Sequence, residues 1–501
     1  MKNVKSFWLW TVFFTLTCFL PVKALAVTWY IPDSYPTIQG ALDDENVIAG
    51  DEVVVRDGTY FENINFNGKA ITLRSENGAD TTIIDGGGDG SVVTFNSYEG
   101  ENSVLNGFTI QNGVAHSGGG IYCYYASPTI TNCTVKGNTA NTNHGGGIYC
   151  TLSSPAITNC TIIENTANGS GGGILCEYDC YPTITNCKIS GNACYNGNGG
   201  GVHFANSSNV IVTNCIISGN TASNDGGGVQ CYRASPIIIN CTITGNASSW
   251  GGGILCYWSS ATVINGVIWG NKASSSNGGD EVYLWYIGDS ITIRYSDINP
   301  NLIQGAGTAN LDTTNINAEP LFIDPQPASE APITAGDYHL QVGSPCIDTG
   351  TDDISTYPNL PTDDIDGDPR PQSAGYDMGA DEFFLIVIID IDIKPGSFPN
   401  AIKLHDSGNI PVAIFGSETF DVITIDVTTL QLNAATVQVN KGKVFLASYE
   451  DINGDGFSDM IVHFDRGEFT PQVGEEDSAT VTGSTVDGTQ FEGTDSVKII
   501  E

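Results

Sequence analysis

The sequence predicts an all-β solenoid, because glycine triplets recur at a short, nearly fixed period and strand-forming residues fill the spaces between them. The triplets begin at residues 118, 145, 171, 199, 226 and 251, and a related Gly-Gly-Asp begins at 278, so the steps are 25 to 28 residues. β-Branched residues dominate the intervening segments, which show strand alternation and no helical period. Each repeat is therefore expected to form one coil of short strands.

The first 26 residues are predicted to be a secretory signal peptide that is not part of the folded protein. Lys2 and Lys5 provide a positive start, residues 7–20 are apolar, and residues 24–26 form a small-residue cleavage site before Val27. The apolar run is short for a membrane span, and no later segment reaches that length. We therefore expect an exported protein without a membrane span, either secreted, extracellular or held at the cell surface.

Charge separates the repeats from the rest of the chain. The formal net charge is −38, from 56 acidic and 18 basic residues, yet residues 118–277 hold four of each. The acidity therefore lies before and after the repeats. A chain this acidic repels nucleic acid and attracts divalent cations, so no nucleic-acid partner is expected.

Two columns of cysteine are expected to face the interior. Side chains of adjacent parallel strands stand about 4.8 Å apart, slightly too far for a relaxed disulfide. We therefore expect buried, unpaired thiols that pack as small hydrophobic groups. Cys180 and Cys194 belong to one coil and lie outside both columns, so they remain the best alternative for a disulfide. The columns are Cys123, Cys150, Cys176, Phe204, Cys231 and Cys256, and Cys133, Cys160, Cys187, Cys215, Cys241 and Gly266.

Asparagines should form two further columns. In "ITNCTV", both Ile130 and Cys133 can face inward only if Asn132 bends the chain, and asparagine tolerates the left-handed conformation better than most residues. Each amide would then bond to the next coil. The outer column is Asn132, Asn159, Asn186, Asn214, Asn240 and Asn265, and the inner column is Asn138, Asn165, Asn192, Asn220, Asn246 and Asn271.

The string GGGI-x-C followed by I-x-N-C-x-I-x-x-N resembles the right-handed parallel β-helix proteins of the pectate-lyase superfamily, over roughly residues 28–385. The resemblance implies an N-terminal cap and first coils in residues 27–117, with a short amphipathic helix at about 36–47 over the open first coil. Regular coils would follow in residues 118–277. Residues 278–385 would hold the last coils and a closing module. Within them, residues 338–350 and 364–382 resemble a module that often closes bacterial β-helices.

Aromatic and polar side chains occupy the outward positions of the first strand of each repeat. Such a row along an elongated surface could stack on sugar rings. The alternative is that the rings stack on one another as a surface ladder. The candidate binding residues are Tyr122, Tyr124, Tyr149, Tyr178, His203, Tyr232, Arg233, Tyr257 and Trp258.

The repeats offer few groups for catalysis, and no catalytic residue can be assigned. Glycoside hydrolases need two carboxylates that face one groove, and Glu177 with Asp179 is the one close pair within the repeats. The acidic run at residues 363–368 is expected to shape a turn or bind a cation. We therefore predict a noncatalytic adhesion or glycan-contact protein whose partner is an extracellular polysaccharide or a cell-surface glycan. The alternative is a polysaccharide-active lyase or glycoside hydrolase.

Residues 386–501 lose the period and contain no cysteine, and their strand pattern predicts a small β-sandwich-like domain. Oxygen donors alternate around a glycine turn at Asp451, Asn453, Asp455 and Asp459, and the Phe457 carbonyl would complete the ring. This spacing is typical of a structural calcium loop. The alternative is a plain acidic turn.

Overall fold

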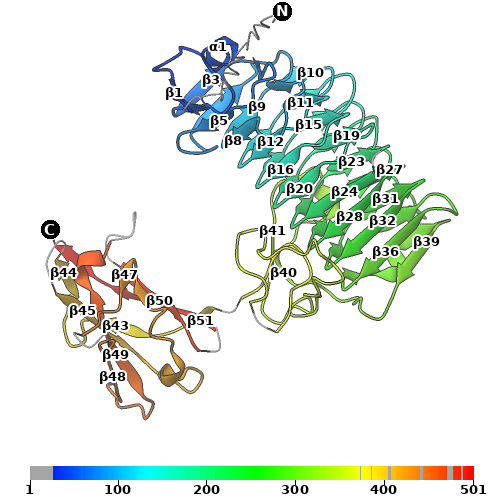
Figure 1. The fold of residues 1–501 in the computed structure, drawn as a ribbon. Helices are drawn as coiled ribbons and strands as arrows, with labels where there is room; N and C mark the ends of the chain where they lie inside the picture. Colours follow the sequence, from blue (N-terminus) through cyan, green and yellow to red (C-terminus); the bar gives the residue numbers. More distant parts are fainter. Residues whose placement is uncertain are drawn as a thin grey trace, which may run out of the picture.

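The structure is a computed structural model that describes residues 26–500 apart from residues 207, 373, 385, 404–407, 441–443, 471–477 and 487–488. The predicted signal peptide lies outside the described residues except for Ala26. Stacked coils occupy the first part of the chain, an irregular segment follows, and a separate set of sheets ends it (Figure 1). Within these ranges no helix has both the length and the apolar content needed to cross a membrane.

Each regular coil contains four short strands, and each strand joins a different parallel sheet. In the coil that starts at Ile121 these are β11 (Ile121–Tyr124) in sheet 1, β12 (Thr129–Thr131) in sheet 2, β13 (Thr134–Lys136) in sheet 3 and β14 (Thr139–Ala140) in sheet 4. Each pairs in parallel with the equivalent strand of the next coil. The solenoid expected from the glycine period is confirmed.

Sheets 1 and 2 run the length of the solenoid. Sheet 1 also contains β4 (Ile64–Asn65), β7 (Val93–Phe95), β15 (Ile148–Thr151), β19 (Ile174–Glu177), β23 (Val202–Ala205), β27 (Val229–Tyr232), β31 (Ile254–Tyr257), β35 (Val282–Leu284) and β38 (Ile303–Gly305). Sheet 2 also contains β1 (Thr28–Ile31), β2 (Glu52–Val55), β5 (Thr72–Ser75), β8 (Val104–Asn106), β16 (Ala156–Thr158), β20 (Thr183–Thr185), β24 (Ser208–Thr213), β28 (Ser235–Ile239), β32 (Ser260–Ile264), β36 (Ser290–Arg294) and β39 (Thr308–Leu311).

Sheets 3 and 4 complete the coils. Sheet 3 also contains β3 (Gly58–Phe61), β6 (Thr82–Asp85), β9 (Thr109–Gln111), β17 (Thr161–Ile163), β21 (Lys188–Ser190), β25 (Ile216–Ser218), β29 (Thr242–Thr244), β33 (Val267–Trp269) and β37 (Asp297–Ile298). Sheet 4 also contains β10 (Val114–Ala115), β18 (Thr166–Ala167), β22 (Ala193–Cys194), β26 (Thr221–Ala222), β30 (Ala247–Ser248) and β34 (Lys272–Ala273).

The cysteine columns pack in the interior as predicted. Cys123 pairs in register with Cys150, which pairs with Cys176 on its other side. All thirteen described cysteines are buried and free. The alternative disulfide is wrong: Cys180 packs in the main core, whereas Cys194 packs with three alanines in a separate cluster beneath sheet 4.

Both asparagine columns form, with different surroundings. The six outer asparagines have φ between 47° and 53°, which confirms the predicted left-handed bend. The inner column is buried, and its ladder is regular: the Asn165 Nδ2 donates to the Asn192 Oδ1 at 3.0 Å, and the Asn165 backbone nitrogen donates to the same oxygen at 3.0 Å. Each inner amide thus satisfies backbone groups that would otherwise be unpaired in the interior.

The glycine triplets let the chain turn and pack closely against its neighbours. Gly118 has φ +64°, which an L-residue with a side chain adopts at a cost. A Cβ at Gly119 would lie 2.6 Å from the Thr139 nitrogen and 2.7 Å from the Gly146 carbonyl oxygen. The chain must therefore turn and pass close to its neighbours at this point, which explains why the triplet marks each coil.

A short helix covers the first coil. The helix α1 (Ile38–Asp43) begins after Thr37, whose side chain accepts from the Gly40 nitrogen at 3.0 Å. It is shorter than the expected 36–47 segment, because Asp44 already has extended backbone angles. Ile38 and Leu42 join the solenoid core, so the expected cover is present.

The segment after the last coils packs along the side of the solenoid, and we name residues 320–384 the lateral module. It follows the 3-10 helix η1 (Pro300–Leu302) and contains β40 (Phe322–Asp324), η2 (Ala328–Glu330) and β41 (Asp337–Leu340). The Ile333 nitrogen donates to the Gly219 carbonyl oxygen at 2.9 Å, and Phe322, Tyr338 and Met378 share a core with Val267. The resemblance implied a cover for the solenoid end, whereas these contacts lie on its flank.

Residues 386–500 form a separate β-domain with its own core. One sheet has the order β42-β51-β50-β46-β47, a second has the order β43-β45-β49-β48, and β44 pairs with β52. The described ranges fit the predicted small β-sandwich-like domain. The elements are β42 (Ile386–Ile388), β43 (Ile391–Ile393), β44 (Ala401–Lys403), β45 (Asn409–Ile414), η3 (Val422–Thr424), β46 (Gln431–Leu432), β47 (Ala435–Thr436), β48 (Ala447–Glu450), β49 (Asp459–Asp465), η4 (Arg466–Glu468), β50 (Ser478–Ser484), β51 (Gln490–Ser496) and β52 (Lys498–Ile500).

Candidate functional site

Two surfaces of the solenoid carry groups that could bind a ligand. The first is the outward face of sheet 1, where the register aligns side chains from successive coils. Tyr122 pairs with Tyr149, and Tyr124 lies in the same column as Glu177, Tyr232 and Tyr257. The sequence placed these residues on one face, and the strand register confirms that placement.

The aromatic residues near the end of the solenoid form a continuous row, which we name the aromatic row: Tyr232, Tyr257, Trp258, Trp285 and Tyr286. The Trp258 and Tyr286 rings stack with centroids 5.2 Å apart and planes 6° apart. The guanidinium of Arg233 lies 4.5 Å from the Trp258 ring centroid. Trp258 nevertheless keeps 47% of its surface exposed.

A smaller aromatic group lies nearer the N-terminus. The Tyr122 and Tyr149 rings stack with centroids 5.5 Å apart, and the Tyr149 hydroxyl donates to Glu177. Tyr124 and Tyr178 are exposed at this edge. The rings therefore contact one another, as the ladder interpretation expected, and still leave open surface, as the binding interpretation expected.

His203 does not belong to an open surface. It occupies the outward column between Leu175 and Gln230, but only 7% of it is exposed and all three residues are buried. Burial lowers the pKa of His203 to about 3, so the imidazole is neutral near pH 7. Its expected role in contacting a ligand is therefore wrong, and the aromatic surface has two parts.

The carboxylates considered for catalysis are engaged separately. Glu177 accepts from Tyr149, whereas Asp179 accepts from the Tyr181 hydroxyl at 3.2 Å. Both Tyr178 and Asp179 have left-handed backbone angles, with φ of 54° and 51°. No contact joins the two carboxylates across a common groove in the described structure, so we assign no catalytic pair.

The second surface is a groove of about 740 Å³ between the coils and the lateral module. The coils contribute Asn159, Asn186 and Lys188. The module contributes Asp337, Tyr338, His339, Asp363 and Asp366 from β41 and from the acidic run. The groove therefore brings together charged residues that lie far apart in the sequence.

His339 is the centre of a charged cluster in this groove. Its Nε2 lies 2.8 Å from the Asp366 Oδ2, and its Nδ1 contacts the Asp337 Oδ1. The contacts with Asp366 and Asp337 raise the pKa of His339 to about 10, although burial alone would lower it. Burial raises the pKa of nearby Asp381 to about 6. In the absence of another cation, the imidazole is therefore protonated at neutral pH.

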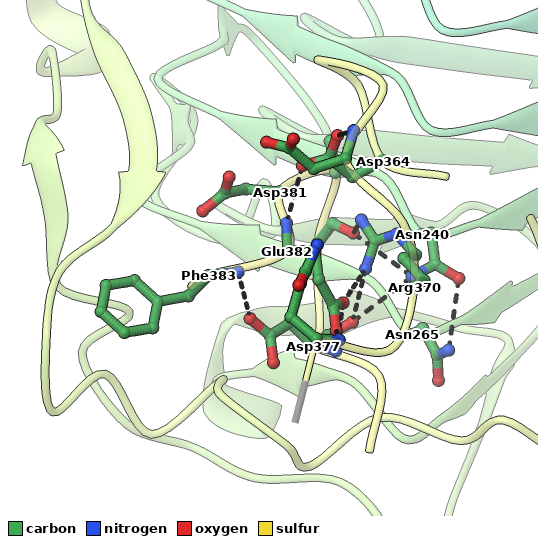
Figure 2. Close-up of polar contacts among 12 residues, drawn as sticks. Asn240, Asn265, Asp364, Arg370, Asp377, Asp381, Glu382 and Phe383 are labelled. Atoms are coloured by element: carbon green, nitrogen blue, oxygen red, sulfur yellow. Dashed lines mark hydrogen bonds and ion pairs between the residues drawn. The ribbon is translucent and has the colours of Figure 1, made fainter. Parts of the chain in front are cut away.

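The module reaches this position because it binds the outer asparagine column. The Asn265 side chain exchanges two 2.8 Å hydrogen bonds with the Thr351 backbone, and the Asn240 Nδ2 donates to the Asp377 carbonyl oxygen at 3.3 Å. Asn214 donates to the Asp363 carbonyl oxygen. Figure 2 shows the Asn240 and Asn265 amides beside the module segments that carry Arg370 and Asp377.

A buried ion pair holds the docked segments together. The Arg370 Nη1 donates to the Glu382 Oε2 at 2.7 Å, and the two side chains are 0% and 1% exposed (Figure 2). Asp364 accepts from the backbone nitrogens of Asp366 and Asp368, at 2.9 and 2.8 Å. The acidic run therefore shapes a turn, which is one of the two roles expected for it.

The structure places the expected calcium-loop residues after β48, and the last of them, Asp459, is the first residue of β49. Asp451 accepts from the Gly454 nitrogen at 2.7 Å and from the Gly456 nitrogen at 3.1 Å. Asn453 and Asp455 bond to each other and are exposed. Asp459 is buried and accepts from the Gly416 nitrogen at 2.9 Å, and the Phe457 nitrogen donates to Asp455.

Two features of these surfaces escaped prediction. Trp285 and Tyr286 were not placed in the aromatic row, because the glycine signal weakens after residue 278. The groove was missed because His339, Asp366 and Asp381 meet only through docking of the lateral module. The acidic run at 363–368 was the available signal.

Family models match two overlapping parts of the chain. Residues 158–303 match the model described as a right handed beta helix region. The solenoid is a right-handed β-helix. Residues 44–216 match the model described as periplasmic copper-binding protein (NosD). The groove residues of the lateral module lie outside both matched ranges.

The remaining comparisons add no assignment. The curated proteins contain no match. Similar solved structures include pectin methylesterase in complex with hexasaccharide VII, at 10% identity over 59% of this chain and 92% of that chain, with a TM-score of 0.27. A substituted pectin methylesterase in complex with hexasaccharide IV is 8% identical over the same shares, with a TM-score of 0.22.

Proposed function

We propose that this β-helix is an exported, noncatalytic glycan-contact protein that holds an extracellular polysaccharide or cell-surface glycan against the aromatic row. The observation that carries the proposal is the state of Trp258. Its ring is stacked with Tyr286 and Arg233, yet 47% of its surface is open. Its two faces pack against Arg233 and Tyr286 of the adjacent coils, so the open part is the ring edge, and an ordered aromatic edge can contact a sugar at a low cost in side-chain entropy.

Backbone geometry supports a role beyond packing. Tyr125, Leu152, Tyr178, Arg233 and Trp258 all have φ between 50° and 54° at the turn that ends the first strand of a coil. Asparagine tolerates this conformation better than bulky residues do. Asn206 occupies the turn in one coil, so the turn accepts asparagine. Ligand contact would explain the conformational cost at the turns that carry an aromatic ring or Arg233, whereas Leu152 has no ring to offer a sugar.

Charge favours a neutral glycan. The chain has a formal net charge of −38, and Asp179 and Glu177 lie between the two aromatic groups. A polyuronate would be repelled at long range. Contact with aromatic rings requires no charge on the sugar, so neutral polysaccharides are the expected partners.

Affinity electrophoresis tests the proposal. Gels that contain neutral polysaccharides should slow the wild-type protein, whereas gels that contain polyuronates should not. Trp258→Asn should abolish the retardation because it removes the ring at a turn that accepts asparagine. Leu152→Asn is the matched control at the equivalent turn and should keep it. Equal retardation of both variants, or none for the wild type in any gel, would contradict the proposal.

The alternative of a polysaccharide-active enzyme rests on Glu177, which is partly exposed and bonded to Tyr149. A turnover screen against neutral glycans and polyuronates separates the two functions. We expect no product. Product release that disappears in Glu177→Gln and Asp179→Asn would replace glycan contact with catalysis.

We further propose that the Asp451–Asp459 loop holds a structural calcium ion. Three carboxylates in one short loop repel one another without a cation, and calcium would offset that repulsion. At a hundredfold excess over Kd the ion would stabilise the native state by about 2.7 kcal/mol. Calorimetry of the full chain should show one transition that chelator lowers, and Asp455→Ala should remove the difference. Transitions that are identical with and without calcium would contradict this site.

We propose that residues 1–26 direct export of the protein, which is then secreted, extracellular or held at the cell surface. The periplasmic description of one matching family supports export. Mass spectrometry of the exported protein should find Val27 as its first residue. Retention of residues 1–26 in the exported protein would contradict the predicted signal peptide.

A further inference from the structure

Three side chains of the lateral module converge at the groove. Each of His339, Asp366 and Asp381 offers one potential ligand atom, and these atoms all lie within 4.8 Å of one another. His339 comes from β41, Asp366 from the turn that Asp364 shapes, and Asp381 from the segment before Glu382. The docking of three separate segments therefore creates a mixed nitrogen and oxygen donor set.

We propose that His339, Asp366 and Asp381 bind a divalent transition-metal cation, with Zn²⁺ as the reference ion. Zinc binds imidazole nitrogen and carboxylate oxygen at roughly 2.0–2.2 Å, so two ligands of one ion stand about 3 Å apart. The His339 Nε2 and the Asp366 Oδ2 already stand 2.8 Å apart. Small side-chain movements would therefore bring both atoms to one ion.

Asp337 prepares the imidazole for this role. It contacts the His339 Nδ1, so it would accept the proton on that nitrogen and leave Nε2 available to the metal. Such a carboxylate behind a metal-binding histidine fixes the ring and its tautomer. Asp337 is therefore a positioning residue and not a ligand.

Asp381 is a buried carboxylate that forms no ion pair on its interior side in the described structure. It is 7% exposed, and the Leu340 nitrogen donates to its Oδ2 at 2.7 Å. Figure 2 shows its carboxylate pointing away from Arg370, which pairs with Glu382. A buried carboxylate is stable in its charged form only when it is paired or coordinates a metal. Its counterion must therefore come from the groove side, where His339 lies.

The donor set distinguishes this site from the calcium loop. Calcium prefers six to eight oxygen ligands, whereas zinc accepts imidazole and tolerates four ligands. The His339 and Asp366 side chains are 46% and 51% exposed, so water or a groove ligand can complete the coordination. The proposal concerns residues outside the 44–216 match to the copper-binding family and does not depend on glycan contact.

Calorimetric titration of the full chain with Zn²⁺, in excess calcium, tests the site. We expect one saturable site in the wild type. His339→Ala and Asp366→Asn should each weaken binding by more than about 100-fold, and Asp337→Asn by about 10-fold to 100-fold, because it only positions the ring. His116→Ala is the control, because His116 is exposed, does not line the groove and contacts Thr142 and Asn143.

Melting curves in the absence of zinc separate loss of ligands from loss of fold, and Asp366→Asn is the variant that changes the shape least. Zinc should raise the melting temperature of the wild type and not that of Asp366→Asn. An unchanged zinc affinity in both His339→Ala and Asp366→Asn would overturn the proposal. No saturable site in the wild type would also overturn it, and His339 itself would then be the cation that pairs with the carboxylates.

Discussion

The two asparagine columns stand six residues apart in every coil, yet only the inner column keeps the same hydrogen-bond pattern from Asn138 to Asn246. The inner amides are buried from Asn138 to Asn271, and each bonds to the next coil. The outer amides change partners. Asn132 and Asn159 bond to the preceding coil and are exposed, whereas Asn240 and Asn265 are buried and bond to the lateral module.

The difference shows which contacts a repeat determines by itself. Each inner amide from Asn138 to Asn246 meets the next copy of its own coil, so its environment follows from the period, and Asn271 at the end of the column meets Glu281 instead. An outer amide faces away from the core, so its environment depends on what docks there. The groove lies where the exposed part of the outer column ends, since Asn159 and Asn186 line it opposite His339.

The largest expected effect comes from separating the module from the coils. Arg370→Ala leaves Glu382 buried without its partner, and breaking such a pair costs about 3–5 kcal/mol. Hydrogen exchange should show lost protection in residues 337–382, while the coils at residues 118–170 keep theirs. If the whole solenoid lost protection together, the two halves of the outer column would be one cooperative unit and the comparison would fail.

A smaller effect is expected within the inner column. Asn192→Ala removes the acceptor for the Asn165 nitrogen and the donor to the Ile162 carbonyl oxygen, which lies at 2.8 Å. Leaving both groups buried and unpaired should cost roughly 2–4 kcal/mol. Asn159→Gly in the outer column keeps the left-handed turn and should cost under about 1 kcal/mol. Chemical denaturation of both variants measures the difference, and equal costs would contradict the distinction between columns.

The end of the inner column predicts a dependence on pH. Glu281 accepts from Asn271 and from the Gly270 nitrogen, and burial raises its pKa to about 8, from 4.5. Between these pH values the folded state holds a proton that the unfolded state has lost, so this group makes stability fall as pH rises. Glu281→Gln should remove the slope and stabilise the protein by ~1–3 kcal/mol at pH 8. Parallel pH profiles for the two proteins would contradict the assignment of this pH dependence to Glu281.

Loss of one thiol from the cysteine column should also have a modest effect. Cys150→Ala leaves a small cavity in the core and should cost on the order of 1–3 kcal/mol without loss of secretion. Denatured, unreduced protein should titrate at least ten of the thirteen described thiols as free. Mostly oxidised thiols would show that the columns are covalent links.

Sequence alone predicted the parts of the molecule that repeat. The register of Cys123 with Cys150, the left-handed Asn132 and the inward packing of Ile130 all follow from strand alternation and a fixed period. Each coil supplies independent support for the same position, so even Phe204 in place of cysteine did not obscure the column.

The candidate sites were less predictable because they depend on contacts without a period. His203 holds an outward position by count, but it is buried in the structure. His339 and Asp381 come together at the groove only when the lateral module docks on Asn214, Asn240 and Asn265. No local pattern encodes that docking, since it joins backbone atoms of irregular segments to a column that is identical elsewhere.

A crystal structure of the full chain with a neutral oligosaccharide that retards it in gels would test the central claim most directly. The account predicts a sugar ring in contact with Trp258 and Tyr286 on the outward face of sheet 1, and no sugar in the groove beside His339. A sugar bound between Lys188 and the lateral module, with the aromatic row free, would contradict it.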